Sequence, residues 1–245
     1  MPKNENALIL ETVSETASFR IPEFHNYHKS LPLPPVTTIV GLVGAALGLS
    51  NEDAQSFFSN RTIKMGIYGQ SRGHYTDLWK AMSSKKGVRD TVIKKEFHYR
   101  NKYKFVFISD DKTIGELELA FKNPSYPTVI GSSDSLLKIV KVVKEKNPAI
   151  FQTNRFENCV LMGDYLNSIQ IDLDKLELGK TYQYTPITAP QVYNLPIGFD
   201  FQSDGVRKIK KRAEMTFIGM IVKSEKSLPA IKYKNSIIPV FDHCP

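Results

Sequence analysis

The sequence has little cysteine and no long hydrophobic run. Its two cysteines, Cys159 and Cys244, lie far apart and belong to no CxxC motif. This argues against a disulfide framework, a zinc site and an oxidising compartment, so we expect two buried thiols in a reducing cytoplasm. The longest apolar run, residues 36–49, contains threonines and is shorter than the ~20 residues that cross a bilayer. No membrane span is predicted, and no secretory signal is visible at the N-terminus.

Motifs of several enzyme classes are also missing. We find no nucleophile elbow, no Walker motif and no dinucleotide-binding glycine pattern. Two carboxylate pairs, Asp110 with Asp111 and Asp172 with Asp174, have no histidine at ligand spacing and are interpreted as a helix cap and a loop. We therefore expect no metal site and no cofactor.

Positive charge is abundant and concentrated in one segment. The net charge is +8, and residues 61–104 hold twelve basic but only three acidic residues, so this segment carries the whole surplus. Aromatic residues and histidines lie between the cations, the combination with which proteins bind phosphates and unstacked bases of single-stranded RNA. The alternative is a solvated basic hairpin whose rings pack inward. The candidate RNA-binding residues here are Arg61, Lys64, Arg72, His74, Tyr75, Lys80, Lys85, Lys86, Arg89 and Arg100.

The order of expected elements is typical of an α+β, ferredoxin-like domain. A helix capped by Thr37 or Thr38 should end at Gly48, and Gly41 and Gly44 give it a smooth face that suits close packing on a sheet. Further helices should begin at Ser50 and at Asp110 or Asp111. The remaining expected elements are strands at 7–13, 63–67, 91–99, 103–109 and 136–143, an irregular basic stretch to about residue 90, a turn at 100–102 and a connector at 126–134.

The second half of the chain differs in character. Prolines punctuate short apolar runs after residue 148, so we predict a β-rich C-terminal lobe at 148–245 after an N-terminal domain at 1–147. A second basic cluster at 207–212 could extend the RNA-binding surface or contact a protein, and is otherwise a solvated loop or strand edge.

Four segments, taken in order, resemble one family. They are Ala-Ser-Phe-Arg at 17–20, a proline-rich entry into a glycine/alanine helix at 31–48, Tyr126-Pro127 followed by Ile-Gly-Ser-Ser-Asp at 130–134, and Ile-Pro-Val-Phe at 238–241. Together they resemble the CRISPR-associated RAMP proteins that hold the 5′ handle of the crRNA in type I Cascade, of the I-B branch. The segment 31–48 is the most specific of the four.

The resemblance implies a non-catalytic subunit at the foot of a ribonucleoprotein effector, in antiviral defence or in an effector taken up by a transposon. Its core would be an RRM-like RAMP domain with a basic thumb at about 61–104. The thumb and the face beside the first helix would hold the crRNA handle. Other surfaces would contact the Cascade backbone subunit and the large PAM-reading subunit, with target DNA bound only indirectly. Arg20, Ser132 and Ser133 join the RNA-binding candidates, although Ser132 stands where the family often has arginine.

A sister branch of that family cleaves precursor RNA without metal, using tyrosine, lysine and histidine. A base deprotonates the 2′-OH, which attacks the adjacent phosphate, and an acid protonates the leaving 5′-oxygen. Such pairs are equally expected as stacking rings, so we expect a non-enzymatic subunit, with a metal-independent endoribonuclease as the alternative. The candidate nuclease residues are Tyr27, His28, Lys29, His74 and Tyr75, with His98 and Tyr99 as a further pair.

Overall fold

A computed structural model describes residues 5–24, 27–81, 91–172, 189–202 and 206–242. In these residues the chain is mostly β, with the three α-helices α1 (Val36–Leu47), α2 (Asn51–Ser59) and α3 (Asp111–Lys122). This composition agrees with the expected α+β class. No helix within the described ranges is long and apolar enough to cross a membrane.

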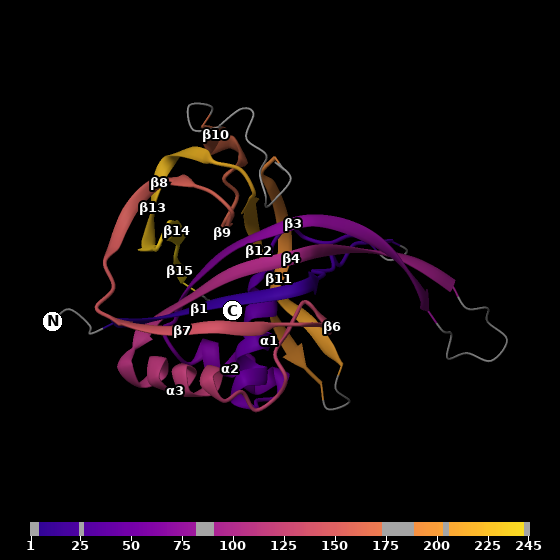
Figure 1. The fold of residues 1–245 in the computed structure, drawn as a ribbon, viewed down its shortest axis with the longest axis horizontal. Helices are drawn as coiled ribbons and strands as arrows, with labels where there is room; N and C mark the ends of the chain where they lie inside the picture. Colours follow the sequence, from indigo (N-terminus) through magenta and orange to yellow (C-terminus); the bar gives the residue numbers. More distant parts are fainter. Residues whose placement is uncertain (1–4, 25–26, 82–90, 173–188, 203–205, 243–245) are drawn as a thin grey trace.

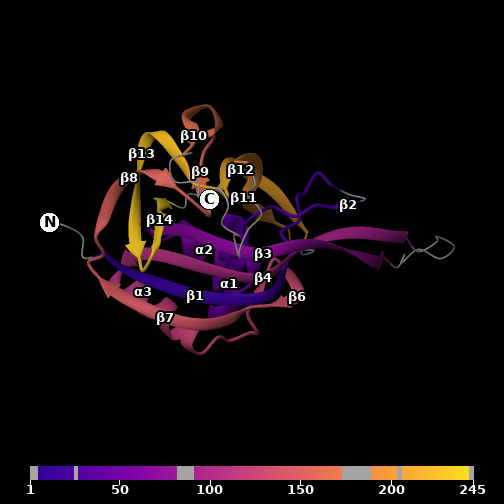
Figure 2. The same ribbon diagram turned by 45° about the horizontal axis from the view of Figure 1, so that its top comes forward.

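The strands form two large sheets and one small hairpin (Figures 1 and 2). The nine-stranded main sheet has the order β11-β12-β9-β3-β4-β1-β7, with β2 beside β4 and β15 beside β3. The bounds in this sheet are β1 (Glu5–Ala17), β2 (Tyr27–His28), β3 (Lys64–Ala81), β4 (Thr91–Asp110), β7 (Lys138–Lys146), β9 (Cys159–Met162), β11 (Gln191–Phe201), β12 (Arg207–Ile218) and β15 (Phe241–Asp242). The second sheet contains β8 (Ile150–Phe156), β10 (Ile169–Ile171), β13 (Val222–Tyr233) and β14 (Ser236–Pro239), and the hairpin contains β5 (Val129–Ile130) and β6 (Ser132–Leu136).

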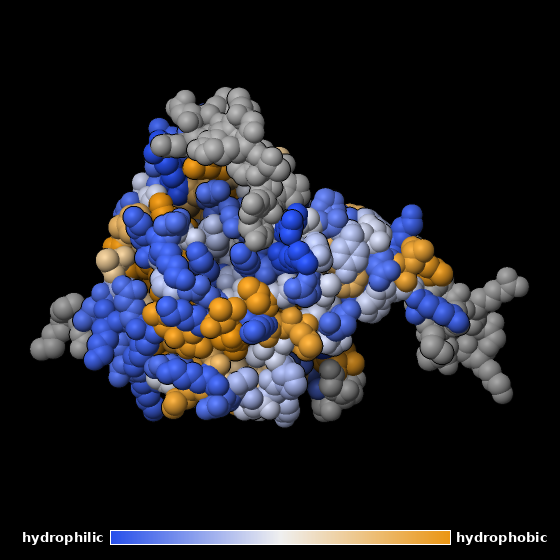
Figure 3. Space-filling model, in the orientation of Figure 1, coloured by the Kyte–Doolittle hydropathy of each residue, from blue (hydrophilic) through white to orange (hydrophobic). Residues whose placement is uncertain are grey.

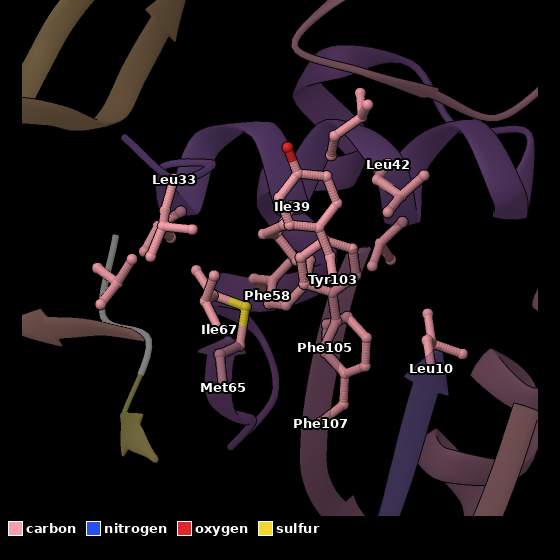
Figure 4. Close-up of a cluster of buried hydrophobic side chains, with 14 of the residues drawn as sticks. Leu10, Leu33, Ile39, Leu42, Phe58, Met65, Ile67, Tyr103, Phe105 and Phe107 are labelled. Carbon is pink, nitrogen blue, oxygen red and sulfur yellow. The ribbon is translucent and has the colours of Figure 1, made fainter. Parts of the chain in front are cut away.

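Both faces of the main sheet are buried near its centre. The three helices cover one face, and β13 and β14 cover part of the other (Figure 1). Side chains alternate across β1: Leu8 and Leu10 belong to the helix-side core, whereas Ala7 and Ile9 pack with Ile231 and other residues of the second sheet. Alternation of this kind is what a strand buried on both sides requires. Figure 4 shows the helix-side core.

Helix ends follow the expected signals with one correction. Gly48 ends α1 in the left-handed conformation (φ 75°), Ser50 Oγ accepts the Asp53 amide at 3.1 Å, and Asp110 caps α3. The expected threonine cap of α1 is wrong, because Pro35 takes the extended N-cap position and the helix begins directly after it without a side-chain cap. The glycine face of α1 was expected to pack on the sheet, but at Gly44 it packs on α2. A Cβ added to Gly44 would lie 2.7 Å from the Cβ of Ala54.

The basic segment is more regular than predicted. Instead of an irregular stretch up to residue 90 and a turn at 100–102, β3 and β4 form one long antiparallel ribbon whose pairing runs from Lys64 with Ile108 to Ala81 with Thr91. The ribbon projects beyond the body of the molecule (Figures 1 and 2). The turn-like residues cause only a local irregularity: Arg100 has φ 49°, and the Arg72–Arg100 pair is missing from a ladder whose register is the same on both sides of it. Lys85, Lys86 and Arg89 lie outside the described residues.

The described residues after 148 are β apart from the 3₁₀ helix η1 (Leu166–Ser168). Strands β9, β11, β12 and β15 join the main sheet, whose other strands lie within residues 1–147, and the boundary between 147 and 148 stays a prediction. Cys159 is fully buried, as expected; Cys244 and Asp174 lie outside the described residues. Asp172, expected in a loop, directly follows β10 and pairs with Arg155 at 3.0 Å.

Candidate RNA-binding surface

One face of the ribbon carries a row of aromatic rings. Tyr75 lies opposite Phe97, and their rings stack with centroids 5.4 Å apart. The Trp79 ring lies 6.0 Å from that of Phe97. Phe97 is buried, but Tyr75 and Trp79 are each 40% exposed, so the expectation of inward-packed rings is met by Phe97 and not by the other two. The exposed rings are available for stacking with bases.

A lysine lies beneath these rings. The Nζ of Lys95 is 3.8 Å from the centroid of Trp79 and 4.5 Å from that of Phe97, which is within the range of cation–π attraction. It is also 3.8 Å from a carboxylate oxygen of Asp134 on β6. Burial lowers the pKa of Lys95, while Asp134 acts in the opposite direction. Lys95 thus ties the ribbon to the β5–β6 hairpin.

Lys95→Met is expected to change the fluorescence of Trp79, the only tryptophan of the chain. The substitution removes an ammonium group 3.8 Å from the ring centroid, so the emission maximum should shift. The free energy of unfolding should fall by about 1 kcal/mol as the cation–π contact is lost. Emission spectra and urea unfolding measure both effects. Lys94→Met, at the exposed neighbouring position, is the control, and identical spectra for both variants would contradict the contact.

The opposite face of the ribbon binds the segment that precedes α1. Glu96 accepts a hydrogen bond from the Tyr27 hydroxyl and another from the Ser30 amide at 3.0 Å. His98 is half-buried; its Nε2–H donates to the Leu31 carbonyl at 2.7 Å, and burial lowers its pKa. These contacts hold residues 27–31 beside β4.

A cavity of about 190 Å³ lies between this segment and the ribbon. Lys29, His74 and His98 line it together with Glu96, so three residues of two types considered for RNA cleavage, lysine and histidine, meet there. Tyr75 follows His74 along the strand and therefore points to the other face of the ribbon.

A second concave surface, here called the α1 groove, lies on the helix side of the sheet. It is a cavity of about 310 Å³ lined by Thr37, Gly41, Gly131, Phe199 and Arg207, among others. The guanidinium of Arg207 lies 4.9 Å from the centroid of the Phe199 ring. No atom lies within 4 Å of a Cβ added to Gly41, so this part of α1 is open.

Gly131 joins the α1 groove to the start of the chain. It has φ 82°, and a Cβ there would lie 2.2 Å from the Ser18 carbonyl oxygen. The β5–β6 hairpin therefore packs on residues 17–20, and through Lys95 and Asp134 it also contacts the ribbon. Three of the four segments that carry the family resemblance converge at this point.

Comparisons with known proteins agree with that resemblance. Residues 7–158 match the family described as CRISPR-associated protein (Cas_Cas5), which is more than half of the chain. The chain belongs to the Cas5 family. No curated protein matches it.

Three solved structures are similar to this Cas5-family chain to different degrees. A chain described as "CRISPR RNA-guided surveillance complex" has a TM-score of 0.52 at 12% identity, covering 90% of this chain and 91% of that one. "Crystal structure of a CRISPR protein from Archaeoglobus fulgidus" gives 0.45 at 12% identity over 98% and 100%. "Crystal structure of Cas protein" gives 0.36 at 18% identity over 52% of this chain and 57% of that one. The first of these shows a shared fold.

The predicted residues of the Cas5-family chain fall into separate places. Arg20, Arg72 and Lys80 are exposed, and Arg100 lies 3.7 Å from Glu15. Arg61 lies just before β3 and pairs with Glu116 at 3.3 Å. Lys64 is the first residue of β3 and pairs with Glu5 at 3.0 Å.

The serines of the β5–β6 hairpin differ in their surroundings. The Ser132 hydroxyl lies 3.1 Å from that of Ser135, whereas Ser133 is exposed. No sequence signal pointed to Phe199, whereas Lys95 is one of the basic residues counted in segment 61–104 and Arg207 belongs to the second basic cluster. Within the ranges that the structure describes, no group of three His, Cys, Asp or Glu side chains is placed to hold a metal ion.

Proposed function

We propose that this Cas5-family chain is the non-catalytic subunit that binds the 5′ handle of the crRNA in a type I Cascade effector, of the I-B branch. The observation that carries the proposal is the convergence of residues 17–20, the start of α1 and the β5–β6 hairpin at Gly131, next to the projecting ribbon. The similar fold of a chain in an RNA-guided surveillance complex supports it further.

The two surfaces would divide the work of holding a single strand. The ribbon is the thumb of an RRM-like RAMP core; its exposed Tyr75 and Trp79 stack with splayed bases, and Arg72 meets phosphates. The α1 groove is large enough for part of a nucleotide and places Arg207 beside it. Remaining surfaces contact the Cascade backbone and large subunits, so that target DNA is reached only through the complex.

Gly41→Leu should separate stability from RNA binding. Leucine is favoured over glycine in a helix by roughly 0.8 kcal/mol, and Gly41 faces open space, so the free energy of unfolding should rise. The same side chain would occupy the α1 groove, so affinity for a handle oligonucleotide should fall about tenfold. Urea unfolding and fluorescence anisotropy measure the two effects. Gly115→Leu, also open and helical, is the control; unchanged affinity of Gly41→Leu would exclude the groove from the RNA-binding surface.

The alternative function is metal-independent cleavage of precursor crRNA in the 190 Å³ cavity. Its favourable observation is the meeting of Lys29, His74 and His98. Two hydrogen bonds within the chain argue against this function. Nε2 of His98 is engaged as a donor to Leu31, and the hydrogen bond from Tyr27 to Glu96 raises the pKa of Tyr27, so that less phenolate is present near neutral pH to act as the base.

Incubation of the purified protein with repeat RNA in EDTA should therefore yield no defined handle-length product. The RNA should instead be retained, and co-expression with neighbouring CRISPR subunits and a guide should bring the chain down in a ribonucleoprotein of fixed stoichiometry. Sequencing gels measure the first outcome and native mass spectrometry the second. Specific cleavage that disappears in His74→Ala would establish the nuclease instead.

A further inference from the structure

A separate cavity lies on the face of the main sheet that the helices do not cover. It has a volume of about 420 Å³ and is bounded by the parts of β1, β3 and β4 that extend past the second sheet, by β7, and by the turn between β13 and β14. Val13, Lys102, Lys104, Val140 and Ser236 are among its lining residues. Neither proposed RNA-binding surface uses it.

Lys104 is a half-buried cation without a close counter-ion. Its Nζ donates to the Ser236 hydroxyl at 2.6 Å, and it lies 5.1 Å from the Tyr68 ring centroid and 5.9 Å from that of Tyr233. In the part of the chain that the structure describes, no carboxylate lies within 4 Å of it. Burial lowers the pKa of Lys104. Removing a cation from water without a neutralising partner costs free energy, and a group of this kind that lines a cavity is a candidate for a binding site.

The nearest carboxylate is already engaged elsewhere. Glu11 accepts a hydrogen bond from the Tyr233 hydroxyl at 2.5 Å and pairs with Lys234 at 2.6 Å. Burial and this hydrogen bond raise the pKa of Tyr233 to about 12, so the phenol stays neutral and keeps donating to Glu11. Glu11 is thus engaged by Tyr233 and Lys234, whereas Lys104 has no carboxylate within 4 Å among the residues that the structure describes.

The lining identifies the kind of anion. Base stacking needs exposed rings, but Tyr68 and Tyr233 are only partly exposed. Lys104 also lies over Tyr68, and Lys104 and Lys234 lie over Tyr233. The cavity has apolar sides instead, Val13 and the exposed Val140 of β7. Figure 3 shows hydrophobic side chains gathered over β7. Cations beside an apolar band complement an acidic residue between apolar neighbours, not a run of phosphates.

We propose that this cavity is a docking site for a partner protein, in which Lys104 receives the carboxylate of a glutamate or aspartate flanked by apolar side chains. The site is independent of the proposed binding of RNA. Removal of a charge-assisted hydrogen bond should weaken such a complex by about tenfold or more.

The test uses the full ¹⁵N-labelled chain and three probes: the peptide Ac-Val-Glu-Val-NH₂, its glutamine counterpart Ac-Val-Gln-Val-NH₂, and hexauridylate. The acidic peptide should shift the amide resonances of Asn235, Ser236 and Lys104 saturably, and the glutamine peptide should bind at least about tenfold more weakly. The Lys104→Gln variant should bind the acidic peptide more weakly by the same factor. The Lys232→Gln variant, which removes an exposed charge from β13, should bind this peptide as tightly as the unaltered chain does.

Three results would overturn the proposal. They are equal binding of the two peptides, unchanged binding by Lys104→Gln, and absence of saturable shifts at these residues with the acidic peptide. Shifts of the same resonances by hexauridylate at equal or higher affinity would assign the cavity to RNA instead. Because the peptide comparison uses the unaltered chain, it stands even if Lys104→Gln does not fold.

Discussion

Reversal of charge at Arg72 and Lys94 together is expected to weaken binding of a crRNA 5′-handle oligonucleotide about 100-fold. Both side chains are exposed on the ribbon, and neither forms an ion pair with any residue that the structure describes. Each is therefore available to phosphates. Loss of two charge-assisted hydrogen bonds at about 1.5 kcal/mol each gives about two orders of magnitude in the dissociation constant.

The salt dependence of the same double variant, Arg72→Glu with Lys94→Glu, tests the mechanism. For a single strand, each phosphate contact contributes about 0.7 to the slope of log K against log salt, so the slope should become shallower by roughly 1.4. Anisotropy titrations at several salt concentrations measure it. Lys112→Glu with Lys232→Glu changes the net charge equally at exposed positions of α3 and β13. Equal losses of affinity in both double variants would mean that net charge, and not the ribbon, controls binding.

The helices could be predicted because their signals lie within one turn of the chain. Ser50 and Asp110 accept amides three residues further on, and Gly48 adopts the positive φ that a helix end requires. These contacts need no distant partner. Helix α1 begins earlier than the expected threonine cap because Pro35, which has no amide hydrogen to satisfy, occupies the N-cap position.

The ribbon could not be predicted because its glycine at position 69 is required by a side chain that is distant in the sequence. Gly69 looks like part of a mobile loop, yet a Cβ there would lie 2.4 Å from the Tyr103 ring. The residue must therefore be small so that a β4 side chain can pack across β3. Similarly, the Arg100–Asn101 pair suggests a chain reversal, whereas Arg100 adopts a positive φ within β4, which continues past it. Local turn propensity is overridden here by pairing of the two strands along their whole length.

The candidate site was predictable as a set of segments but not as a set of contacts. The family resemblance indicated residues 17–20, 31–48 and 126–134, and these segments do converge. The role of Lys95 depends on Trp79 and Asp134 from two other strands, so its charge alone suggested an exposed RNA contact. Arg61 shows the reverse case: a cation counted toward the basic segment is held by Glu116 and lies over the Phe57 ring.

Gly131→Ala should cause the largest loss of stability of any single methyl group added to this surface. Gly131 has φ 82°, and the new Cβ would lie 2.2 Å from the Ser18 carbonyl oxygen and 2.8 Å from the Phe19 ring. Strain at such a backbone angle, added to contact with an immobile carbonyl, should lower the free energy of unfolding by roughly 2–4 kcal/mol. Urea unfolding followed by circular dichroism measures it.

Binding should respond in the same variant because the hairpin must move away from residues 17–20 to relieve the overlap. Its displacement would also pull Asp134 from Lys95, so the Trp79 emission should shift as in Lys95→Met, and handle affinity should fall. Gly115→Ala is the matched control: nothing lies within 4 Å of its added Cβ, and alanine should stabilise α3 by up to about 1 kcal/mol. If Gly131→Ala retained full stability and Trp79 emission, the hairpin would not be held by this contact, and the convergence on which the RNA-binding surface depends would lose its physical basis.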